Sequence, residues 1–513
     1  MIYQRDTAAQ FCDRLGFGRP YTPNTIPAMF WLLTAAAASV AALAYAVELL
    51  FYPLPHVRGI PTVPFWVALL PLVKDIDQMD VFKAYIEGPL RKYGAVKIFF
   101  ASQWNIIIHH PRYLAEVLKH TNIYEKSGND EKIPHSVLAS LLGNNIISGR
   151  GDTWKTYQRI IKPGLQARQD LGRLQENATK LRNMILAQLE ESGGAKLHSI
   201  IQKHTINNFT AIFYNTDTKT SGVPLDQMQT QLKREIFKPL FMSFPVLDRL
   251  GLSSRENARR LASQFTDTLI SLLRTGPGTR LTQDLLEARG NGTLTEKQFR
   301  DNVTVLFVAG QENPQLATIS TLYLLAKHPD IQQQLYKEIV NNDTLNGGTE
   351  ITEETLQAMP LLTAVVLESI RLFPPIGQLI NRRTTTSVCL GGDIFIPKGT
   401  YIGYNCVSTN RDLEAWGANA NDFVPSRWGL SSEEIRREYR QRKARAEFLS
   451  FHGGQRACLG EKFALSQLKI TLCVLVRSVQ WALDPAWPER MTPAGPLCPS
   501  NLQLKFTARA SGS

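Results

Sequence analysis

Cysteine is scarce and scattered in this sequence. Six cysteines occur among 513 residues, and no two of them form a CxxC pair. This spacing argues against a structural zinc site, and six isolated cysteines in so long a chain do not make a disulfide framework. A reducing compartment fits this usage best. The cysteines stand at positions 12, 389, 406, 458, 473 and 498.

Linkers, internal repeats and nucleic-acid motifs are also absent. No Gly/Ser-rich or Pro-rich tract divides the chain beyond its first 64 residues, so we expect one large catalytic domain over residues 65–513. The net charge of +12 is compatible with an anionic membrane face or an acidic protein partner. A solvated basic surface is the default interpretation, and we expect no nucleic-acid partner.

The N-terminal region contains a long uncharged run. The 20 residues from Ala28 to Val47 carry no charge, and a helix of that length crosses a hydrocarbon core of about 30 Å. We expect a tail over 1–27, a transmembrane anchor over 28–52 and a proline-rich hinge over 53–64. A cleaved signal peptide and a buried alanine-rich helix are the alternative interpretations.

The most informative segment lies near the C-terminus. Residues 451–460 read Phe-His-Gly-Gly-Gln-Arg-Ala-Cys-Leu-Gly, and a helical pattern follows from Glu461 to Val476. Cys458 therefore stands in a glycine-rich turn that opens a helix. The start of a helix lowers the pKa of a thiol, and the thiolate is the form that binds metal. Arg456 adds a fixed cation suited to a carboxylate. A glycine-rich turn around a buried free cysteine is the structural alternative.

This segment resembles the haem-binding signature of the cytochrome P450 superfamily at Phe451, Gly454, Arg456, Cys458 and Gly460. The resemblance implies a mainly α-helical fold with small β-sheets, here preceded by an N-terminal transmembrane helix, and haem b as the cofactor. It implies that Cys458 is the axial thiolate ligand of the iron. It also implies that Arg456 pairs with a haem propionate and that Phe451 packs near the sulfur.

Two supporting motifs resemble the same family. Glu368 and Arg371 stand three apart on one helix face and resemble its ExxR pair. Such pairs usually decorate solvated faces, but apolar residues flank this one, and Arg427 is expected to complete the cluster. Arg382 resembles the strand residue that supplies another propionate cation, with Arg383 as the fallback.

A third motif departs from the family pattern. The segment from Trp154 resembles the helix whose WxxxR contacts the propionates, but Gln158 stands where the family has arginine. Arg159 follows one position later and points about 100° away on a helix. The resemblance implies a haem contact for Trp154 and leaves one propionate to be held differently.

The apolar run near residue 305 ends in Ala-Gly-Gln-Glu-Asn-Pro at 309–314. A glycine and a proline four apart predict a kink or an opened turn. The segment resembles the AGx(D/E)T motif: Ala309, Gly310 and Glu312 match, and Asn313 replaces threonine. The resemblance implies a haem contact for Ala309 and Gly310 and proton guidance toward dioxygen by Glu312 and Asn313. A solvent-facing Glu312 at a bend is the structural alternative.

The same segment bears on the reaction. Asparagine cannot relay a proton as a hydroxyl does. Ring formation, or phenol or indole coupling without oxygen insertion, is therefore an alternative to hydroxylation. Residues 126–147 and 376–379 are expected to line the pocket. The basic run 433–445 is expected to steer an acidic reductase, with a solvated helix as the alternative.

Taken together, the motifs resemble a fungal haem-thiolate monooxygenase. The resemblance implies oxidation of a lipophilic or aromatic small molecule of secondary metabolism with O₂ and electrons from NADPH-cytochrome P450 reductase. It implies a location at the endoplasmic reticulum membrane, with the catalytic domain in the cytosol. Two rivals are a haem-thiolate enzyme that uses peroxide or rearranges its substrate, and a non-enzymatic membrane haem sensor.

Overall fold

The computed structural model describes residues 25–51, 54, 56–192, 197–216, 224–342 and 350–509. The chain divides into two compact units, Met1–Pro53 and Leu54–Ser513. The boundaries expected for the tail, anchor, hinge and catalytic domain stay predictions. Residues 1–24, 52, 53 and 55, which belong to the first three of these segments, lie outside the described residues.

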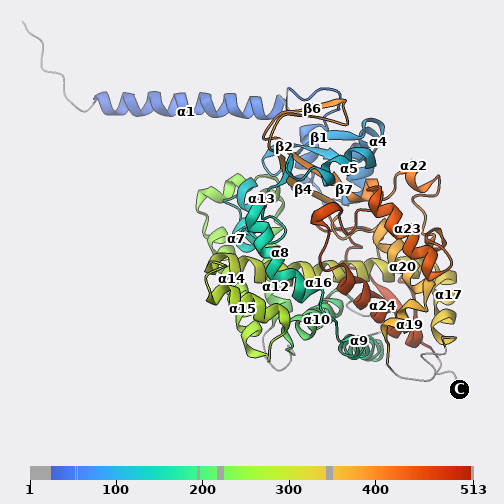
Figure 1. The fold of residues 1–513 in the computed structure, drawn as a ribbon. Helices are drawn as coiled ribbons and strands as arrows, with labels where there is room; N and C mark the ends of the chain where they lie inside the picture. Colours follow the sequence, from blue (N-terminus) through green and yellow to red (C-terminus); the bar gives the residue numbers. More distant parts are fainter. Residues whose placement is uncertain are drawn as a thin grey trace, which may run out of the picture. The chain divides into compact units, whose positions relative to one another are not determined.

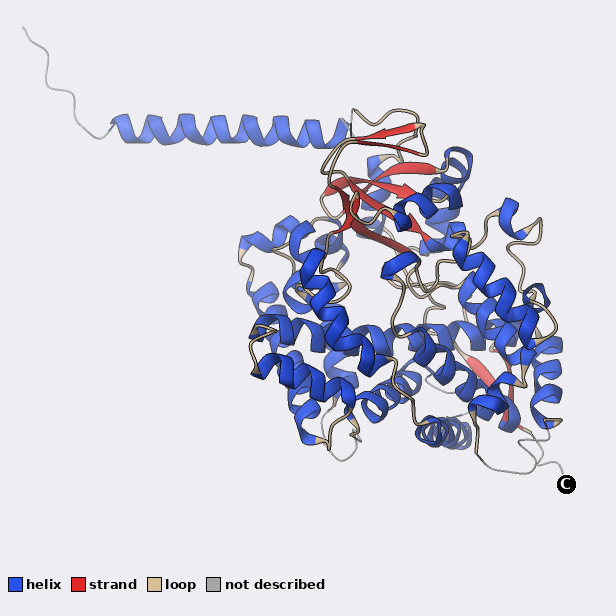
Figure 2. Cartoon of the chain, in the orientation of Figure 1, coloured by secondary structure: helices blue, strands red, loops and turns tan. Residues whose placement is uncertain are grey.

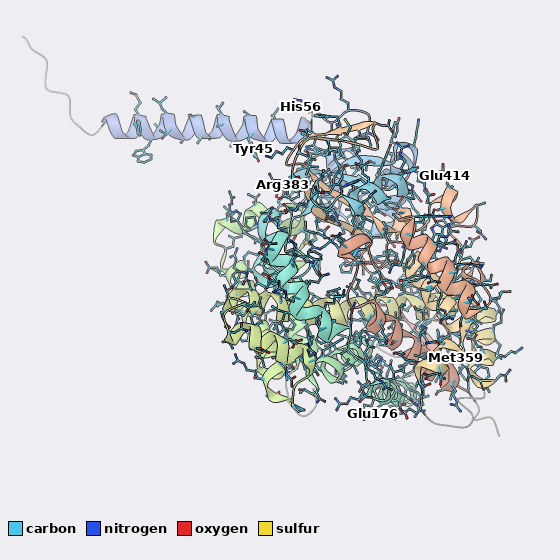
Figure 3. All side chains as sticks on the ribbon, viewed as in Figure 1. Tyr45, His56, Glu176, Met359, Arg383 and Glu414 are labelled. Atoms are coloured by element: carbon cyan, nitrogen blue, oxygen red, sulfur yellow. The ribbon has the colours of Figure 1, made fainter. Side chains whose placement is uncertain are left out.

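Helix α1 (Thr25–Phe51) belongs to the first unit. Its described side chains are exposed and largely apolar, including Trp31 and Tyr45, and Figure 3 labels Tyr45. Within the described part of the chain, no helix combines the length and the apolar character that crossing a bilayer requires.

Helices make up most of the second unit, and its strands gather mainly in one region (Figure 2). The helices of its N-terminal half are α2 (Leu70–Val73), α3 (Gln78–Val81), α4 (Gly88–Tyr93), α5 (Pro111–Lys119), α6 (Asn129–Lys132), α7 (Val137–Leu142), α8 (Gly151–Leu165), α9 (Leu171–Ser192), α10 (Leu197–Phe209), α12 (Leu225–Ile236), α13 (Pro239–Ser243), α14 (Ser253–Thr275) and α15 (Arg280–Gly290). Those of its C-terminal half are α16 (Glu296–Lys327), α17 (Pro329–Val340), α19 (Glu353–Gln357), α20 (Pro360–Leu372), α21 (Cys406–Thr409), α22 (Leu413–Trp416), α23 (Ser432–Ala444) and α24 (Glu461–Ser478). Short 3-10 or π turns are η2 (Phe65–Leu69), η3 (Phe82–Glu87), η4 (Thr210–Tyr214), η5 (Pro245–Leu250), η6 (Pro425–Trp428) and η7 (Gly454–Arg456).

Three small sheets accompany the helices. The largest has the order β1-β2-β7-β4-β3, in which β2 and β7 are parallel and the other neighbours are antiparallel. The second pairs β5 with β6 around a turn, as the sequence predicts, and the third pairs β8 with β9. The strands are β1 (Ala95–Phe100), β2 (Gln103–Ile108), β3 (Tyr124–Lys126), β4 (Gln378–Thr384), β5 (Val388–Leu390), β6 (Ile394–Ile396), β7 (Tyr401–Asn405), β8 (Val479–Leu483) and β9 (Leu504–Ala508).

Helix α16 runs across the second unit, with α14 and α15 near one end and α17 and α20 near the other (Figure 1). A capping box between Thr295 and Gln298 starts it, and His328 and Pro329 end it. Buried residues occur on all its sides, as in a helix that crosses a core. Of the predicted kink or opened turn, the opened turn is wrong, because the helix continues through Pro314, and the kink stays a prediction. A proline removes only its own N–H hydrogen bond, and the packing around this helix supports it elsewhere.

Candidate functional site

The glycine-rich loop before α24 holds Cys458 at the edge of a cavity. The Cys458 N–H donates to the carbonyl of Phe451 at 3.0 Å, which closes the loop on itself. Gly454 has a φ of +63°, and a Cβ there would lie 2.6 Å from the Leu118 carbonyl oxygen. Glycine is therefore required at this position, since a side chain would push the loop away from α5. The loop is a rigid support for the thiol.

The cavity holds about 1410 Å³ of atom-free space, including its part open to solvent. Its wall combines the cysteine loop, one face of α16 and part of α8. From the predicted segments, Lys126, Ile146 and Ile147 of 126–147 and Ile376 and Leu379 of 376–379 line it. Predicted site residues that line it are Trp154, Ala309, Gly310, Asn313, Phe451, Arg456 and Cys458. Apolar residues that line it include Ile146, Ile147, Val305, Leu306, Ile370, Ile376 and Leu379.

The thiol of Cys458 is accessible, and its accessible surface faces the cavity. The expected lowering of its pKa is wrong for the protein without a metal. Burial raises the pKa of the Cys458 thiol and outweighs the opposing hydrogen bond from the Gly460 backbone. A coordinated metal ion reverses this balance, because it takes the place of the proton.

Arg456 lies at the cavity wall beside Trp154. Its guanidinium carbon is 4.4 Å from the centre of a Trp154 ring, and one nitrogen donates to the Gly149 carbonyl at 2.8 Å. Burial and repulsion from Arg382 lower the pKa of Arg456 to about 9. An arginine held this way without a carboxylate partner among the described residues is suited to an anion inside the cavity.

Arg382 is placed differently from its sequence expectation. It is fully buried on β4 and donates to the Tyr124 carbonyl at 2.8 Å, and its Nε has no hydrogen-bond partner among the described residues. It does not line the cavity, whereas Lys126, its register partner on β3, does. The fallback Arg383 faces outward and donates to the Gly399 carbonyl.

The four predicted residues of α16 divide between two faces. Ala309, Gly310 and Asn313 line the cavity, and a Cβ at Gly310 would collide with the ring of Phe209. Glu312 does not line it. Its Oε1 lies 2.7 Å from the Nζ of Lys233 on α12. The solvent-facing alternative for Glu312 is wrong, because its side chain is only 13% exposed and is ion-paired.

The predicted Glu368 cluster is present: Glu368 and Arg371 are fully buried, and Arg427 is half-buried. Arg371 donates twice to the Glu368 carboxylate at 2.8 Å, and Arg427 donates to it at 2.7 Å. The Trp428 indole N–H donates to the same carboxylate at 3.0 Å. A carboxylate with this many donors locks α20 to η6 and supports the cavity wall from behind.

Lys126 was expected at the cavity only as the first residue of the segment 126–147, with no role of its own, and His452 was not singled out by sequence reasoning. Both residues line the cavity, and Lys126 is 95% buried. His452 has a backbone φ of +59°, and its Nδ1 lies at hydrogen-bond distance, 2.9 Å, from the Tyr404 hydroxyl. A signal for Lys126 was the glutamine at Gln158, which left one expected cation to be found elsewhere. The sequence signal for His452 was that this bulky polar residue stands directly before Gly453 and Gly454 in the turn that leads to Cys458.

These residues fit the haem that the sequence resemblance implies. The cavity has apolar walls for a macrocycle and a thiol that faces inward. Near its wall lie three cations, two buried and one half-buried, that lack a carboxylate partner among the described residues, and the two propionates of a haem meet that need. Lys126, Arg382 and Arg456 are these cations.

Comparison with known proteins agrees with this site. The cytochrome P450 family model matches residues 60–506. The chain is 40% identical to cytochrome P450-DIT2 of Saccharomyces cerevisiae over 88% of this chain and 94% of that protein. It is 34% identical to the cytochrome P450 monooxygenase xanG of Aspergillus fumigatus over 85% and 84% of the two chains.

A solved structure shares the fold. The crystal structure of the cytochrome P450DA heme domain superposes with a TM-score of 0.71 at 18% identity, over 88% of this chain and 98% of that one. Both the extent of the family match and the identity to the fungal relatives exceed what a shared fold alone would give. The chain belongs to the cytochrome P450 family, whose members are oxygen-incorporating oxidoreductases that carry haem with its iron bound by a cysteine thiolate.

Proposed function

We propose that this P450 oxidises a lipophilic or aromatic small molecule of fungal secondary metabolism, with Cys458 as the thiolate ligand of its haem. The observation that carries this proposal is that Cys458 lines the same cavity as Ala309, Gly310 and Asn313 of α16. When bound, haem supplies the activation of O₂, which the electron-rich thiolate favours. The protein then has to position substrate, hold the cofactor and deliver protons.

Six residues serve the cofactor in this proposal besides Cys458. Arg456 and Arg382 supply positive charge for the propionates, and Trp154 keeps the Arg456 guanidinium in place through its ring face. Phe451 is 92% buried at the base of the loop and limits water near the sulfur. Ala309 and Gly310 line the cavity with little side-chain bulk and would leave room for the cofactor, and the missing Cβ of Gly310 also lets Phe209 of α10 pack against α16.

The apolar part of the wall supports a lipophilic substrate. Leu306 on α16, Ile370 at the end of α20 and Ile376 in the following loop present aliphatic surface, and Asn313 adds an amide beside them. Such a wall gains free energy from apolar or aromatic groups and offers few polar contacts. A small polar substrate would leave its own hydrogen bonds unmet there.

Glu312 and Asn313 handle protons in different ways. Asn313 reaches the cavity and can orient a water molecule by donating and accepting through its amide. Glu312 stays on the Lys233 side of α16, so its proton has to pass through water or through a side-chain movement. A non-enzymatic haem sensor would not need an acid such as Glu312 beside the cavity, and membership of the family favours an enzyme.

A specific observation also favours the second candidate reaction, oxidative ring formation or coupling without oxygen insertion. The helix position where the family has a threonine hydroxyl is occupied by Asn313, which cannot relay a proton. A reaction in which the substrate itself loses hydrogen depends less on that route. The two reactions differ in whether the product contains an atom from O₂.

The electron donor in this proposal is NADPH-cytochrome P450 reductase, which would dock on α23. Arg436, Arg437 and Arg440 of this helix are exposed. The helix is tied to the start of α24, where the Nζ of Lys443 lies 2.6 Å from Glu461, three residues after the thiol. A basic surface at this place steers an acidic partner to the thiolate side of the site.

We also propose attachment to the endoplasmic reticulum membrane through α1. The support is that its described side chains are exposed and apolar, with Trp31 at 69% exposure. Within the second unit, Trp66, Val73, Leu240 and Val246 are exposed apolar residues on segments that pack together, η2–α2 and α13–η5. Deletion of residues 1–53 is expected to move the protein from the membrane fraction toward the supernatant.

The test of the function combines the purified protein with the reductase, NADPH and ¹⁸O₂ in extracts of the source organism. A product that is two mass units heavier than its ¹⁶O₂ counterpart identifies a monooxygenase. A product that has lost two hydrogens without gaining label identifies coupling or ring formation. Product formation with peroxide alone, and none with NADPH, would contradict the assigned electron donor.

A further inference from the structure

Lys126 and Arg382 stand directly opposite each other across β3 and β4. Opposed residues of antiparallel strands present their side chains on the same face, within about 5 Å at Cβ. Lys126 is 5% exposed and Arg382 is 1% exposed. Like charges in this arrangement repel, so the pair is unfavourable unless an anion lies beside it.

The described residues do not supply that anion. Neither Lys126 nor Arg382 has a carboxylate partner among them, and Glu125, the nearest acid in sequence, is ion-paired with Arg150 at 3.3 Å. Burial, together with the positive charges of Arg382 and Arg456, holds the pKa of Lys126 well below that of a free lysine. Of these three cations, Lys126 and Arg456 line the cavity, so a bound anion would meet those two directly.

The helix position that should carry another cation carries none. Gln158 lines the cavity where the WxxxR motif has arginine, and its amide has no charge. Arg159 is exposed and does not line the cavity. Compared with the WxxxR motif, the site therefore has no cation at the α8 position, whereas Lys126 on β3 supplies a cation at the cavity.

We propose that Lys126 binds the haem propionate that the missing α8 arginine would otherwise bind. This inference deepens the proposed haem site and rests on it. Lys126 approaches from the sheet, with Arg382 behind it as a second positive charge, while Arg456 serves the other carboxylate. The His452 side chain lies in the field of the same two cations, Lys126 and Arg382, which helps keep it neutral.

The experiment measures haem loss and reduction potential in Lys126→Met. The ferric holoenzyme is mixed with excess apomyoglobin, and the transfer of haem is followed by absorbance. A charge-assisted hydrogen bond of ordinary strength predicts about tenfold faster haem loss. Removing a positive charge also favours the ferric state, so the reduction potential is expected to fall. The CO-difference band of a thiolate-ligated haem is expected to persist.

Lys132→Met is the matched control. Lys132 is a half-buried lysine of the same region, but it donates to Asn105 at 2.8 Å and does not line the cavity. Its haem-loss rate is expected to stay within about twofold of the wild type. Adding Gln158→Arg to Lys126→Met returns a cation to the motif position and is expected to restore most of the haem retention.

The outcomes separate this inference from the proposed function. Wild-type haem loss and potential in Lys126→Met would overturn the role of Lys126 and leave Cys458 as the ligand. A lost thiolate band in that variant would also count against it, since the variant should spare the iron–sulfur bond. If Lys126→Met does not fold, Lys126→Arg and Lys126→Gln replace it: faster haem loss in the glutamine variant alone supports the charge, and equal rates contradict it.

Discussion

The Glu312 carboxylate lies 2.7 Å from the Lys233 ammonium, on a different face of α16 from the one with which the adjacent Asn313 lines the cavity. The one acid of this segment is thus held by α12. Proton delivery through Glu312 requires that this contact be exchanged or that water connect it to the cavity. The first prediction therefore distinguishes the role of the Glu312 acid from the role of its ion pair with Lys233.

Glu312→Gln is expected to lower product formation at least tenfold, because proton transfer by a positioned group typically contributes about 10²-fold or more. Lys233→Met removes the same ion pair but keeps the acid, so its turnover is expected to stay within about threefold of the wild type. The measurements are the rate of product formation and, separately, the amount of product formed per NADPH consumed. Equal losses in the two variants would mean that the ion pair only positions α16.

Cys458→Ser is expected to abolish the CO-difference band of a thiolate-ligated haem, because serine supplies no thiolate. Absorbance of the reduced, CO-treated protein is the measurement. Cys389→Ser is the control, since Cys389 is an exposed cysteine on β5 that does not line the cavity. A native Soret and CO band in Cys458→Ser would refute the assignment of the ligand.

Charge reversal on α23 is expected to slow the first electron transfer. Arg436→Glu, Arg437→Glu and Arg440→Glu together should lower the rate of reduction by the reductase about tenfold or more at low salt, with a smaller difference at high salt. Stopped-flow absorbance with CO present measures this rate. A matched reversal of exposed cations on other helices, which should leave the rate unchanged, uses Arg260→Glu, Arg274→Glu and Lys337→Glu.

Glu368→Gln is expected to destabilise the protein by about 3–5 kcal/mol, because it leaves the buried Arg371 without its counter-ion. Thermal unfolding and the yield of haem-loaded protein are the measurements. Glu438→Gln is the control: Glu438 pairs with Arg442 at 2.7 Å on the surface of α23, and loss of such a pair costs less than about 1 kcal/mol. Similar losses in both variants would show that the Glu368 cluster is not essential to the wall.

His204 predicts a pH dependence of stability. It is buried on α10 and contacts the Asn177 carbonyl and the Thr471 hydroxyl, and burial lowers its pKa to about 4 from an ordinary value of 6.5. Between pH 6.5 and pH 4 the unfolded chain therefore binds a proton at His204 that the folded chain does not. As the pH is lowered from 6.5 to 4, the free energy of unfolding therefore decreases, by about 3 kcal/mol in total from this group.

His204→Gln is expected to flatten that part of the dependence. Urea unfolding at pH 5.0, 6.0 and 7.5 measures it, and the absolute stability at pH 7.5 serves as the reference for each protein. An unchanged slope in the variant would mean that His204 titrates normally in the folded chain.

The sequence predicted correctly those parts of the site that residues close together in the chain form. The turn before Cys458, the Glu368–Arg371 pair and the two strands around residue 391 are local, so their geometry follows from a few neighbouring residues. Arg427 joined the cluster as expected because the family resemblance supplied the long-range contact. Trp154 lines the cavity although the arginine of its motif is missing.

Other positions depended on distant packing. One residue on a helix turns a side chain by about 100°, so spacing alone did not separate the face of Glu312 from that of Asn313. The register of β3 and β4 places Lys126 opposite Arg382. On its other edge β4 pairs with β7 through a shift between Ile380 and Arg382, and no local pattern in the sequence signals either pairing. Likewise, the pKa of Cys458 depends on burial by segments that the motif does not contain.

The order of strands in the largest sheet has a consequence for how the protein is made. Strand β3 is held by β4, and Arg382 donates to a carbonyl 258 residues earlier in the chain. During synthesis β1 and β2 can pair with each other at once, but β2 and β3 leave the ribosome long before β7 and β4, their other partners, exist. Strand edges left unpaired beside apolar residues are prone to aggregate. The cofactor chamber closes only when about nine-tenths of the polypeptide has been translated. The nascent chain therefore exposes a half-built sheet for most of its synthesis, and the long-range pairing that completes it comes late.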